Sequence, residues 1–406
     1  MGSKKKIAIF TEFYPFGKGE EFLEDEIKVA EQFFDEIALI SFNKNTKDVT
    51  KYIPKNAIVI PVKKQISRRK LQIKRMLGIF SPDVWKQTIL CLKERGLKGL
   101  LGGLRSSIIE HSVISLLITH EDKWAGKYDI YYSYWLSGFA SYLSMRKQYL
   151  QGTVVARTHG YDCFFDRGFH AHRKEQFHGL DAIYTISNAG KDDLIAQGCR
   201  PEIIHVARLG IIKESESLNP YEQRDEKTIV TCSNIVDLKR LDLLINALSG
   251  VEDITINWIH FGDGVLRHSI QALAEEKLGR KKNISFEFKG WTAHERILQF
   301  YKEHPIDVFV NCSDVEGVPV SIMEAMSYGI PCIARDVGGN REIVNNDNGI
   351  LLSSNCFVEE LRDAIKQMLH MLSVDYLKER DSALNTYLER YNANKNYASF
   401  FEEMVM

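Results

Sequence analysis

Short apolar runs, each followed by a loop and an amphipathic stretch, recur along the chain and predict strands alternating with helices. The expected strands are 6–10, 37–41, 128–134, 153–158, 181–187, 228–232, 256–261, 284–288, 306–310 and 331–334. Their apolar, β-branched character is typical of strands buried on both faces of a parallel sheet. The expected helices are 22–33, 319–328, 358–372, 377–391 and 394–404. This order of elements predicts an α/β architecture.

One stretch, from Ile306 to Ile343, shows the pattern most clearly. It begins with a buried strand and a polar loop that closes at Gly317. Pro319 then fits the first turn of a helix, because its missing N–H costs nothing there. A second strand, 331–334, and a glycine turn into another helix follow. Such a βαβ unit gathers strand ends and helix N-termini on one side, where doubly wound sheets bind ligands.

Two carboxylates frame the turn of this unit, Glu316 in its loop and Glu324 inside its helix. The amides of Gly317 and Val318 lie where the helix begins and suit hydroxyl or phosphate oxygens. A carboxylate one to two turns deeper can accept hydrogen bonds from two neighbouring sugar hydroxyls. In the alternative, Glu316 caps the helix and Glu324 is a solvated helical charge, since acidic residues favour helix starts. Spacing alone leaves both interpretations open.

The length and composition narrow the class of protein. The 406 residues suit two domains of about 200 residues each. A net charge of -1 gives no reason to expect nucleic acid as a partner. The seven cysteines form no C-x-x-C pair, which favours reduced thiols over disulfides or a metal site. We therefore expect a globular protein with no metal.

Two features of the sequence indicate how the chain relates to a membrane. No apolar run approaches the ~18 residues that span a bilayer, so we expect a cytoplasmic chain. Residues 49–82, however, contain nine Lys or Arg and no acidic residue. If this part of the chain is a helix, one face carries the apolar residues Ile66, Ile73, Leu77 and Phe80. The opposite face carries the cations Lys64, Arg68 and Arg75. The segment 63–80 is either an ordinary surface helix or a helix on an anionic membrane surface, at the inner face of the plasma membrane.

Two further candidates follow strands of the first half. The loop after 6–10 contains Gly17-Lys18-Gly19, and a glycine loop between a strand and a helix can cradle phosphate. A plain loop is the alternative there. His159 follows the strand 153–158, and a side chain at the carboxyl end of a parallel strand is placed for a ligand. A lone histidine at such a place is more often structural.

A long ordered match covers one segment of the second half, SDVEGVPVSIMEAMSYGIPCIARDVGGNREIV. Its pattern, E-G-x-P-x-x-x-x-E-A, then G-x-P, a strand and G-G-x-x-E, resembles the donor-sugar motif of glycosyltransferase family 4, the retaining enzymes of GT-B fold. Members that build bacterial capsules and exopolysaccharides are the most similar type. The resemblance implies two Rossmann-like, doubly wound domains that face each other across a cleft. The acceptor domain is expected at 1–212, the donor domain at 213–391, and a C-terminal helix, 392–406, is expected to pack back on the first domain.

The resemblance also implies roles for individual residues. His159, in an H-G-x-D segment, and Glu316 are the expected catalytic residues at the transferred sugar. Glu324 is expected to hold the donor ribose. The expected donor-binding set is Gly17, Gly19, Asn234, Lys239, Arg240, Gly264, Gly290, Trp291, Gly317, Val318, Pro319 and Glu324.

One segment departs from the family pattern. SNIVDLKRLDLL resembles the family's G-R-x-x-x-x-K-G, and Lys239 matches the lysine that neutralises the donor phosphates. Asn234 replaces the usual arginine, while Arg240 replaces the usual glycine. We therefore expect Arg240 to compensate for the cation lost at Asn234.

The expected function is transfer of a sugar from a nucleoside-diphosphate sugar, UDP-linked rather than GDP-linked, to a hydroxyl of a saccharide or lipid-linked acceptor. The resemblance implies retention by same-side attack, in which the leaving phosphate accepts the proton of the acceptor. No Asp-x-Asp occurs, so metal-independent chemistry is expected, with cations and helix amides stabilising the leaving group. The alternatives are a catalytically weak partner subunit of the same fold and a nucleotide-sugar epimerase.

Overall fold

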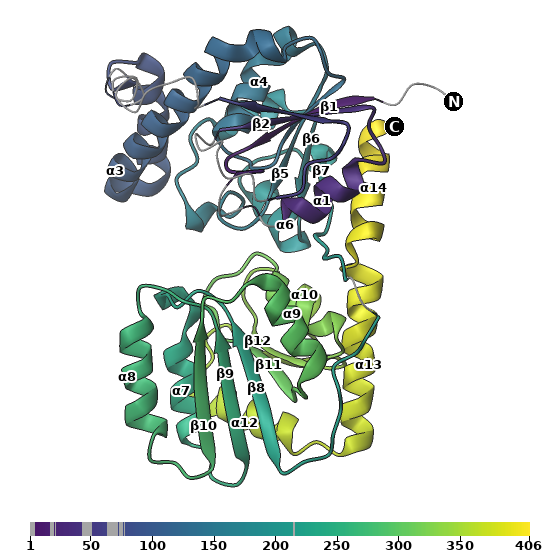
Figure 1. Ribbon diagram of the computed structural model, residues 1–406. Coiled ribbons are helices and arrows are strands. Elements are labelled where there is room, and N and C mark those ends of the chain that lie inside the picture. Colours follow the sequence, from purple (N-terminus) through teal and green to yellow (C-terminus); the bar gives the residue numbers. More distant parts are fainter. Residues whose placement is uncertain are drawn as a thin grey trace. The chain divides into compact units, whose positions relative to one another are not determined.

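The computed structural model describes residues 5–16, 20, 22–42, 51–62, 72, 76, 78–213 and 216–406. Contacts between residues divide the chain into two compact units (Figure 1). Unit 1 comprises Met1–Leu209 and Ala393–Met406, and unit 2 comprises Gly210–Asn392. Most of the segment 63–80 lies outside the described residues, so the helix expected there stays a prediction.

Unit 1 contains a seven-stranded sheet in which every pairing is parallel, in the order β3-β2-β1-β4-β5-β6-β7. Its strands are β1 (Lys6–Thr11), β2 (Glu36–Ser41), β3 (Ala57–Pro61), β4 (Ile130–Ser133), β5 (Thr153–Thr158), β6 (Ala182–Thr185) and β7 (Ile204–Val206). The order reverses between β1 and β4, which is the switch point where open α/β sheets bind ligands. The loop after β4 and the neighbouring loop after β5 therefore lie where a ligand is expected.

Unit 1 also contains α1 (Leu23–Ala30), α3 (Pro82–His120), α4 (Gly138–Leu150), α5 (Arg173–Gly179), α6 (Asn188–Ala196) and α14 (Ala393–Val405). The last of these packs on the unit through aromatic side chains: the ring of Phe401 lies 5.5 Å from that of Phe34. Phe400 contacts the ring of Tyr184 at 4.8 Å and the guanidinium of Arg157 at 4.7 Å. Arg157 in turn forms a fully buried ion pair with Glu26 of α1. The end of the chain thus lies beside its beginning.

Unit 2 contains a six-stranded parallel sheet in the order β10-β9-β8-β11-β12-β13. Its strands are β8 (Glu226–Cys232), β9 (Thr255–Phe261), β10 (Ile284–Gly290), β11 (Val308–Asn311), β12 (Cys332–Arg335) and β13 (Gly349–Leu352). Its helices are α7 (Leu241–Ser249), α8 (Arg267–Leu278), α9 (His294–Glu303), α10 (Val320–Ser327), α11 (Asn340–Ile343), α12 (Val358–Leu369) and α13 (Ser373–Arg390). Figure 1 shows helices on either side of this sheet. The prediction of two doubly wound α/β domains is confirmed.

The polar segment from Lys213 to Lys227 packs on unit 2 where it is described. Asn219 is buried, and its amide donates to the carbonyls of Tyr301 and His304 at 2.6 and 2.8 Å. Arg380 donates to the Asn219 carbonyl at 2.5 Å. Through Asn219 this segment is thus held to unit 2.

One stretch within the described ranges, Pro82–Lys123, is long and apolar enough to cross a bilayer by length and composition. The sequence analysis expected no such stretch. A core helix of a soluble protein meets the same two requirements, and α3 packs on its own unit: the carboxyl group of Glu110 is buried and accepts a hydrogen bond from Ser141 of α4 at 3.0 Å. Burial raises the pKa of Glu110 to about 8, so this carboxyl group is mostly neutral at pH 7.

Candidate functional site

The expected donor-binding residues of unit 2 follow the carboxyl ends of neighbouring strands in one sheet. Asn234 and Lys239 come after β8, Gly264 after β9, and Trp291 after β10. The loop between β11 and α10 contributes 316–319. The strand order reverses between β8 and β11, so the residues gather about the switch point of this sheet. The structure thus brings these positions to one edge of the sheet, while their donor-binding roles stay predictions.

The two expected charged groups at the switch point contact each other. The Nζ of Lys239 lies 2.6 Å from Oε1 of Glu316, and the amide of Asn311 donates to the same oxygen at 3.2 Å. Both side chains are mostly buried, at 24% and 10% exposure. Glu316 is thus oriented by side chains from β11 and from the turn before α7. Since an ammonium group has three N–H donors, Lys239 can bind Glu316 and a phosphate oxygen together.

Glu324 lies in the middle of α10 and is only 6% exposed. Its Oε1 is 2.7 Å from Nε2 of His294, the first residue of α9. The alternative that Glu324 is a solvated helical charge is therefore wrong. A buried carboxylate needs hydrogen-bond partners, and here one partner comes from His294, which the sequence analysis missed because it is thirty positions away in the chain.

Arg240 points toward two carboxylates. Its guanidinium donates to Asp242 at 3.2 and 3.3 Å and to Asp314 at 3.2 and 3.4 Å. Arg335 also binds Asp314. The group of two arginines and two aspartates has no net formal charge. Compensation for Asn234 by Arg240 stays a prediction, and this pairing works against it. Asn234 itself is exposed.

Two of the expected glycines, Gly264 and Gly290, are required by the structure for different reasons. A Cβ on Gly264 would lie 2.3 Å from the carbonyl oxygen of Ile235, so this position lets the loops after β8 and β9 touch. Gly290 has φ 71°, a left-handed conformation that favours glycine. A Cβ there would lie 2.6 Å from the guanidinium of Arg267, which also binds Asp263 at 3.1 Å. Arg267 is a second residue that the sequence analysis missed, and it directly follows the loop 262–266 that contains Gly264.

The remaining expected positions of unit 2 lie in the same region. Trp291 is 69% exposed, while Val318 and Pro319 are buried at the start of α10. The carbonyl of Gly317 accepts from the amide of Gly339 at 2.6 Å, which ties this loop to the turn before α11. Gly17 and Gly19 lie outside the described residues, so their role stays a prediction.

His159 of unit 1 lies in an aromatic cage. Its ring is 4.5 Å from the ring of Tyr134 and 4.6 Å from that of Trp135. The side chain is 9% exposed, and neither ring nitrogen has a hydrogen-bond partner among the residues that the structure describes. Burial, and to a smaller extent the positive charge of Arg157, holds the pKa of His159 well below its usual value. The site therefore presents a neutral imidazole that can donate one hydrogen bond and accept one.

The cage is fixed by two buried carboxyl groups. Asp162 accepts the amide N–H of His159 and that of Leu136, both at 2.8 Å. Glu20 accepts the indole N–H of Trp135 at 2.6 Å and the three amides of 12–14 at 2.7 to 2.9 Å. Glu20 thus joins the loop after β1 to the wall of the His159 site. The Asp at the fourth position of H-G-x-D has a positioning role here.

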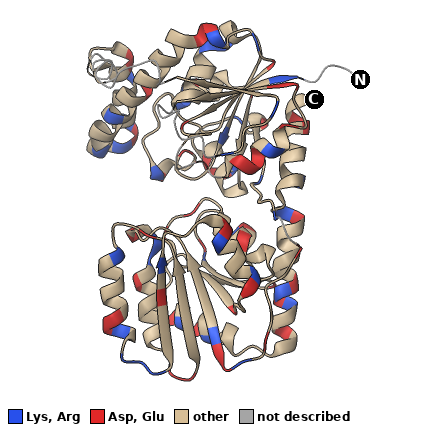
Figure 2. Ribbon diagram, viewed as in Figure 1, with Lys and Arg blue, Asp and Glu red and all other residues tan. Residues whose placement is uncertain are grey.

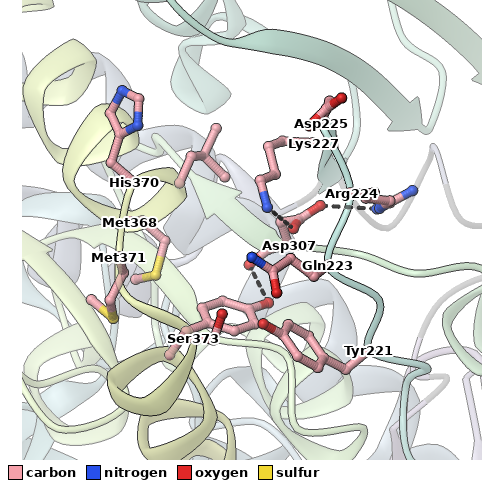
Figure 3. A pocket seen from close by; sticks show the side chains of 12 residues that line it. Tyr221, Gln223, Arg224, Asp225, Lys227, Asp307, Met368, His370, Met371 and Ser373 are labelled. Atoms are coloured by element: carbon pink, nitrogen blue, oxygen red, sulfur yellow. Dashed lines mark hydrogen bonds and ion pairs between the residues drawn. The ribbon is translucent and has the colours of Figure 1, made fainter.

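A separate cavity of about 270 Å³ opens at the other end of the unit 2 strands (Figure 3). Asp307, just before β11, accepts from Arg224 at 2.9 Å and from the amide of Thr228 at 2.7 Å. Lys227 lies 3.5 Å from the same carboxylate. Figure 3 shows Lys227 and Arg224 both directed at Asp307. These contacts join the segment before β8 to the amino ends of the strands, away from the switch-point loops, and we assign this cavity no catalytic role.

No cluster of three or more His, Cys, Asp or Glu side chains suited to holding a metal ion occurs in the described part of the chain.

In a comparison with known families, residues 213–383 match the family described as "Glycosyl transferases group 1". The matched region lies entirely within unit 2 and contains all the described donor-site residues named above.

Among curated proteins, the chain is 27% identical over 213 residues to the amylovoran biosynthesis glycosyltransferase AmsK of Erwinia amylovora, with 49% of this chain and 50% of that protein aligned. It is 25% identical over 258 residues to the O-antigen biosynthesis glycosyltransferase WbnH of Escherichia coli, with 61% of this chain and 68% of that protein aligned. The alignments thus span about half to two thirds of the relatives' lengths.

Solved structures match over nearly the whole chain. The lipopolysaccharide outer core galactosyltransferase WaaB has a TM-score of 0.68 at 20% identity, with 98% of this chain and 99% of that one covered. HepE of Anabaena, in complex with UDP and glucose, has a TM-score of 0.66 at 17% identity and the same coverage. At these identities the likeness concerns the fold, and the expected GT-B class of two Rossmann-like domains is confirmed.

Proposed function

Because residues 213–383 match the family of group 1 glycosyl transferases, we propose that the whole chain moves a sugar from a nucleoside-diphosphate sugar to an acceptor hydroxyl in the synthesis of a bacterial surface polysaccharide. The observation that carries the proposal is the edge of unit 2 at its switch point. There Lys239, Glu316 and Glu324 are mostly buried and stand on loops and helices that follow adjacent strands. This edge offers a cation for phosphate and carboxylates for hydroxyl groups.

We assign the roles at this edge on the basis of its contacts. Glu324, buried one turn into α10, accepts hydroxyl groups of the donor ribose, and His294 holds the carboxylate in place. Lys239 and the amides at the start of α10 stabilise the charge on the leaving diphosphate. Glu316, oriented by Lys239 and Asn311, contacts the transferred sugar.

We assign the chemistry to same-side attack with retention at the anomeric carbon. Double displacement would need a carboxylate nucleophile about 5 Å from a second carboxyl group. Glu316 is already bound to Lys239, which lowers its readiness to attack carbon. In same-side attack the leaving phosphate takes the proton of the acceptor, and the neutral His159 donates a hydrogen bond to the sugar. No metal ion is needed in this scheme, because Lys239 and the helix amides supply the positive charge.

The donor is proposed to be a UDP-sugar. HepE structures contain UDP, and a relative in Escherichia coli, 35% identical over 95 residues, is a UDP-Gal-dependent 1,3-galactosyltransferase that acts on a diphosphoundecaprenol-linked sugar. Another relative, 28% identical over 213 residues, is a GDP-mannose-dependent mannosyltransferase of Mycobacterium tuberculosis. GDP-sugars are therefore included among the donors to be tested. The proposed acceptor is a saccharide or lipid-linked saccharide at the cytoplasmic face of the membrane.

A thermal-shift panel of nucleotide sugars tests the proposal directly. A donor at about 100 times its dissociation constant stabilises the folded chain by about 2.7 kcal/mol, and a UDP-sugar is expected to be the one that does so. Transfer to an acceptor extract, followed by analysis of the anomeric configuration with and without a chelator, then tests retention and metal independence. Stabilisation by no nucleotide sugar would contradict the proposal. Epimerised donor without transfer would favour the epimerase alternative.

A further inference from the structure

α3 is a helical hairpin. At Gly96 the backbone leaves helical geometry, with φ 60° and ψ -153°, a conformation open to glycine. Beyond this point the chain runs back along itself. A Cβ added to Gly99 would lie 2.1 Å from the carbonyl oxygen of Cys91, and one added to Gly103 would lie 2.5 Å from the Cβ of Cys91. The two arms are therefore so close that only glycine fits at both positions.

One side of the hairpin is held to unit 1, as far as the residue before the turn. Ser106 donates to the carbonyl of Phe169 at 2.6 Å, and the guanidinium of Arg95 lies 3.9 Å from the ring centre of Phe165. Lys86 pairs with Glu175 of α5 at 3.0 Å. These contacts hold the faces of both arms that turn toward the unit. They leave the opposite faces near the turn open.

That open region carries two leucines among cations. Leu97 is 83% exposed and Leu101 is 77% exposed. Lys93, Lys98 and Arg105 are exposed in the same part of the helix and outnumber its one exposed acid, Glu94, and none of the three cations has an ion pair within the described part of the chain. Figure 2 shows Lys and Arg along α3. We call the two leucines and the three cations the hairpin tip.

We propose that the hairpin tip is a docking element for an anionic lipid bilayer. Exposed leucines are unfavourable in water and gain by entering the acyl boundary, while neighbouring cations attract anionic headgroups. A rigid turn suits this role, because the glycine-packed arms have little freedom to lose on binding.

A second copy of this chain is a poorer occupant of the hairpin tip. Two copies joined through it would bring like charges together, which opposes association. An anionic surface removes that repulsion. The proposal concerns residues distinct from the segment 63–80, and it stands apart from the donor chemistry of unit 2.

Sedimentation with vesicles tests the proposal. The chain is expected to bind vesicles of phosphatidylglycerol and phosphatidylcholine at low salt, to release them at about 1 M salt, and not to bind phosphatidylcholine alone. Two variants probe the tip: K93E/K98E/R105E and L97S/L101S. At roughly fivefold in affinity per cation, the charge variant should bind at least about a hundredfold more weakly. The leucine variant should lose about tenfold or more per leucine.

A matched control separates the effect of the hairpin tip on vesicle binding from the effect of net charge. K277E/R280E/K282E reverses three exposed cations of unit 2 and changes net charge by the same amount, and it should keep most of the binding. Unchanged circular dichroism and unchanged nucleotide affinity show that the variants remain folded. These checks also keep the result independent of whether the chain transfers sugar.

Three outcomes would overturn the proposal. The first is wild-type protein that does not sediment with anionic vesicles at low salt. The second is binding that the tip variants retain while an R68E/R69E/R75E variant loses it, which would assign docking to the segment 63–80. The third is a dimer in analytical ultracentrifugation that L97S/L101S abolishes, which would make the tip a self-association surface.

Discussion

The two candidate sites differ in how their polar groups are satisfied. At the switch point of unit 2, Lys239 is bound to Glu316, and Glu324 is bound to His294. In unit 1, the buried imidazole of His159 lies between two aromatic rings, and its nitrogens have no partner among the described residues. One site is therefore charged and paired, while the other is neutral and unsatisfied.

This difference suits two parts of a nucleotide sugar. A diphosphate carries full charge and binds best where cations and helix amides are already oriented. A sugar ring is neutral, and its hydroxyl groups both donate and accept. An unsatisfied buried group is costly unless a ligand completes it, so we expect His159 to bind such a hydroxyl group. The comparison teaches that nucleotide affinity and sugar chemistry should be separable by mutation.

The largest expected effect is on turnover at Glu316. In Glu316→Gln the side chain keeps its size but loses the charge that we propose faces the transferred sugar, and kcat is expected to fall by about 10²–10³-fold. Affinity for the bare nucleoside diphosphate should be unchanged or higher, because Lys239 loses its carboxylate partner. Steady-state kinetics and calorimetry measure both quantities. A fall in affinity that matches the fall in kcat would place Glu316 in nucleotide binding instead.

Lys239→Ala should weaken the diphosphate by about 1.5–3 kcal/mol, the range for hydrogen bonds to charged groups. Binding of the nucleoside monophosphate should weaken less, since the monophosphate offers fewer phosphate oxygens to Lys239. Arg240→Ala is the neighbouring control and should have the smaller effect, because Asp242 and Asp314 already engage its guanidinium. Adding Asn234→Arg to the Arg240→Ala variant then tests compensation. Equal losses in the two alanine variants would restore the predicted role of Arg240.

The smallest expected effect is on stability, at another buried histidine, His260. It contrasts a structural histidine with His159. His260 of β9 is fully buried, bonds Thr231 at 2.8 Å, and burial lowers its pKa to about 4. The unfolded chain takes up this proton below about pH 6.5. The free energy of unfolding is therefore full above about pH 6.5 and falls as the pH drops toward 4.

The expected loss from His260 between about pH 6.5 and 5.5 is about 1 kcal/mol. Urea unfolding of His260→Gln should show a shallower pH dependence than wild type, while His268→Gln, at an exposed position, should not. His260 should affect stability alone, in contrast to His159. An identical slope in His260→Gln would show that His260 is not the titrating group.

The sequence predicted the parts of the fold that depend on local pattern. The strand 153–158 was predicted with the bounds that β5 has, and the unit around Glu324 follows the expected strand, loop and helix. Apolar runs and their turns determine such elements within a few neighbouring residues. The positions at the switch point followed from the same rule, because parallel strands put their carboxyl ends at one edge.

The hairpin of α3 was not predicted, because its glycines look like helix breakers in the sequence. Gly99 and Gly103 are helical only because each packs on Cys91 of the other arm, a tertiary effect. The partners of the site residues were missed for a similar reason. His294 reaches Glu324, and Glu20 reaches Trp135, across 30 and 115 positions of the chain.

The central claim is that unit 2 binds the nucleotide and that His159 acts on the sugar alone. Calorimetric titration of the nucleoside diphosphate into Glu324→Gln and His159→Ala, side by side with wild type, tests it most directly. Glu324→Gln should lose about 1.5–3 kcal/mol of binding free energy, since a charge-assisted contact to the ribose is removed. His159→Ala should bind the nucleotide as wild type does while its kcat falls. Wild-type nucleotide affinity in Glu324→Gln, or an equal loss in both variants, would contradict the account.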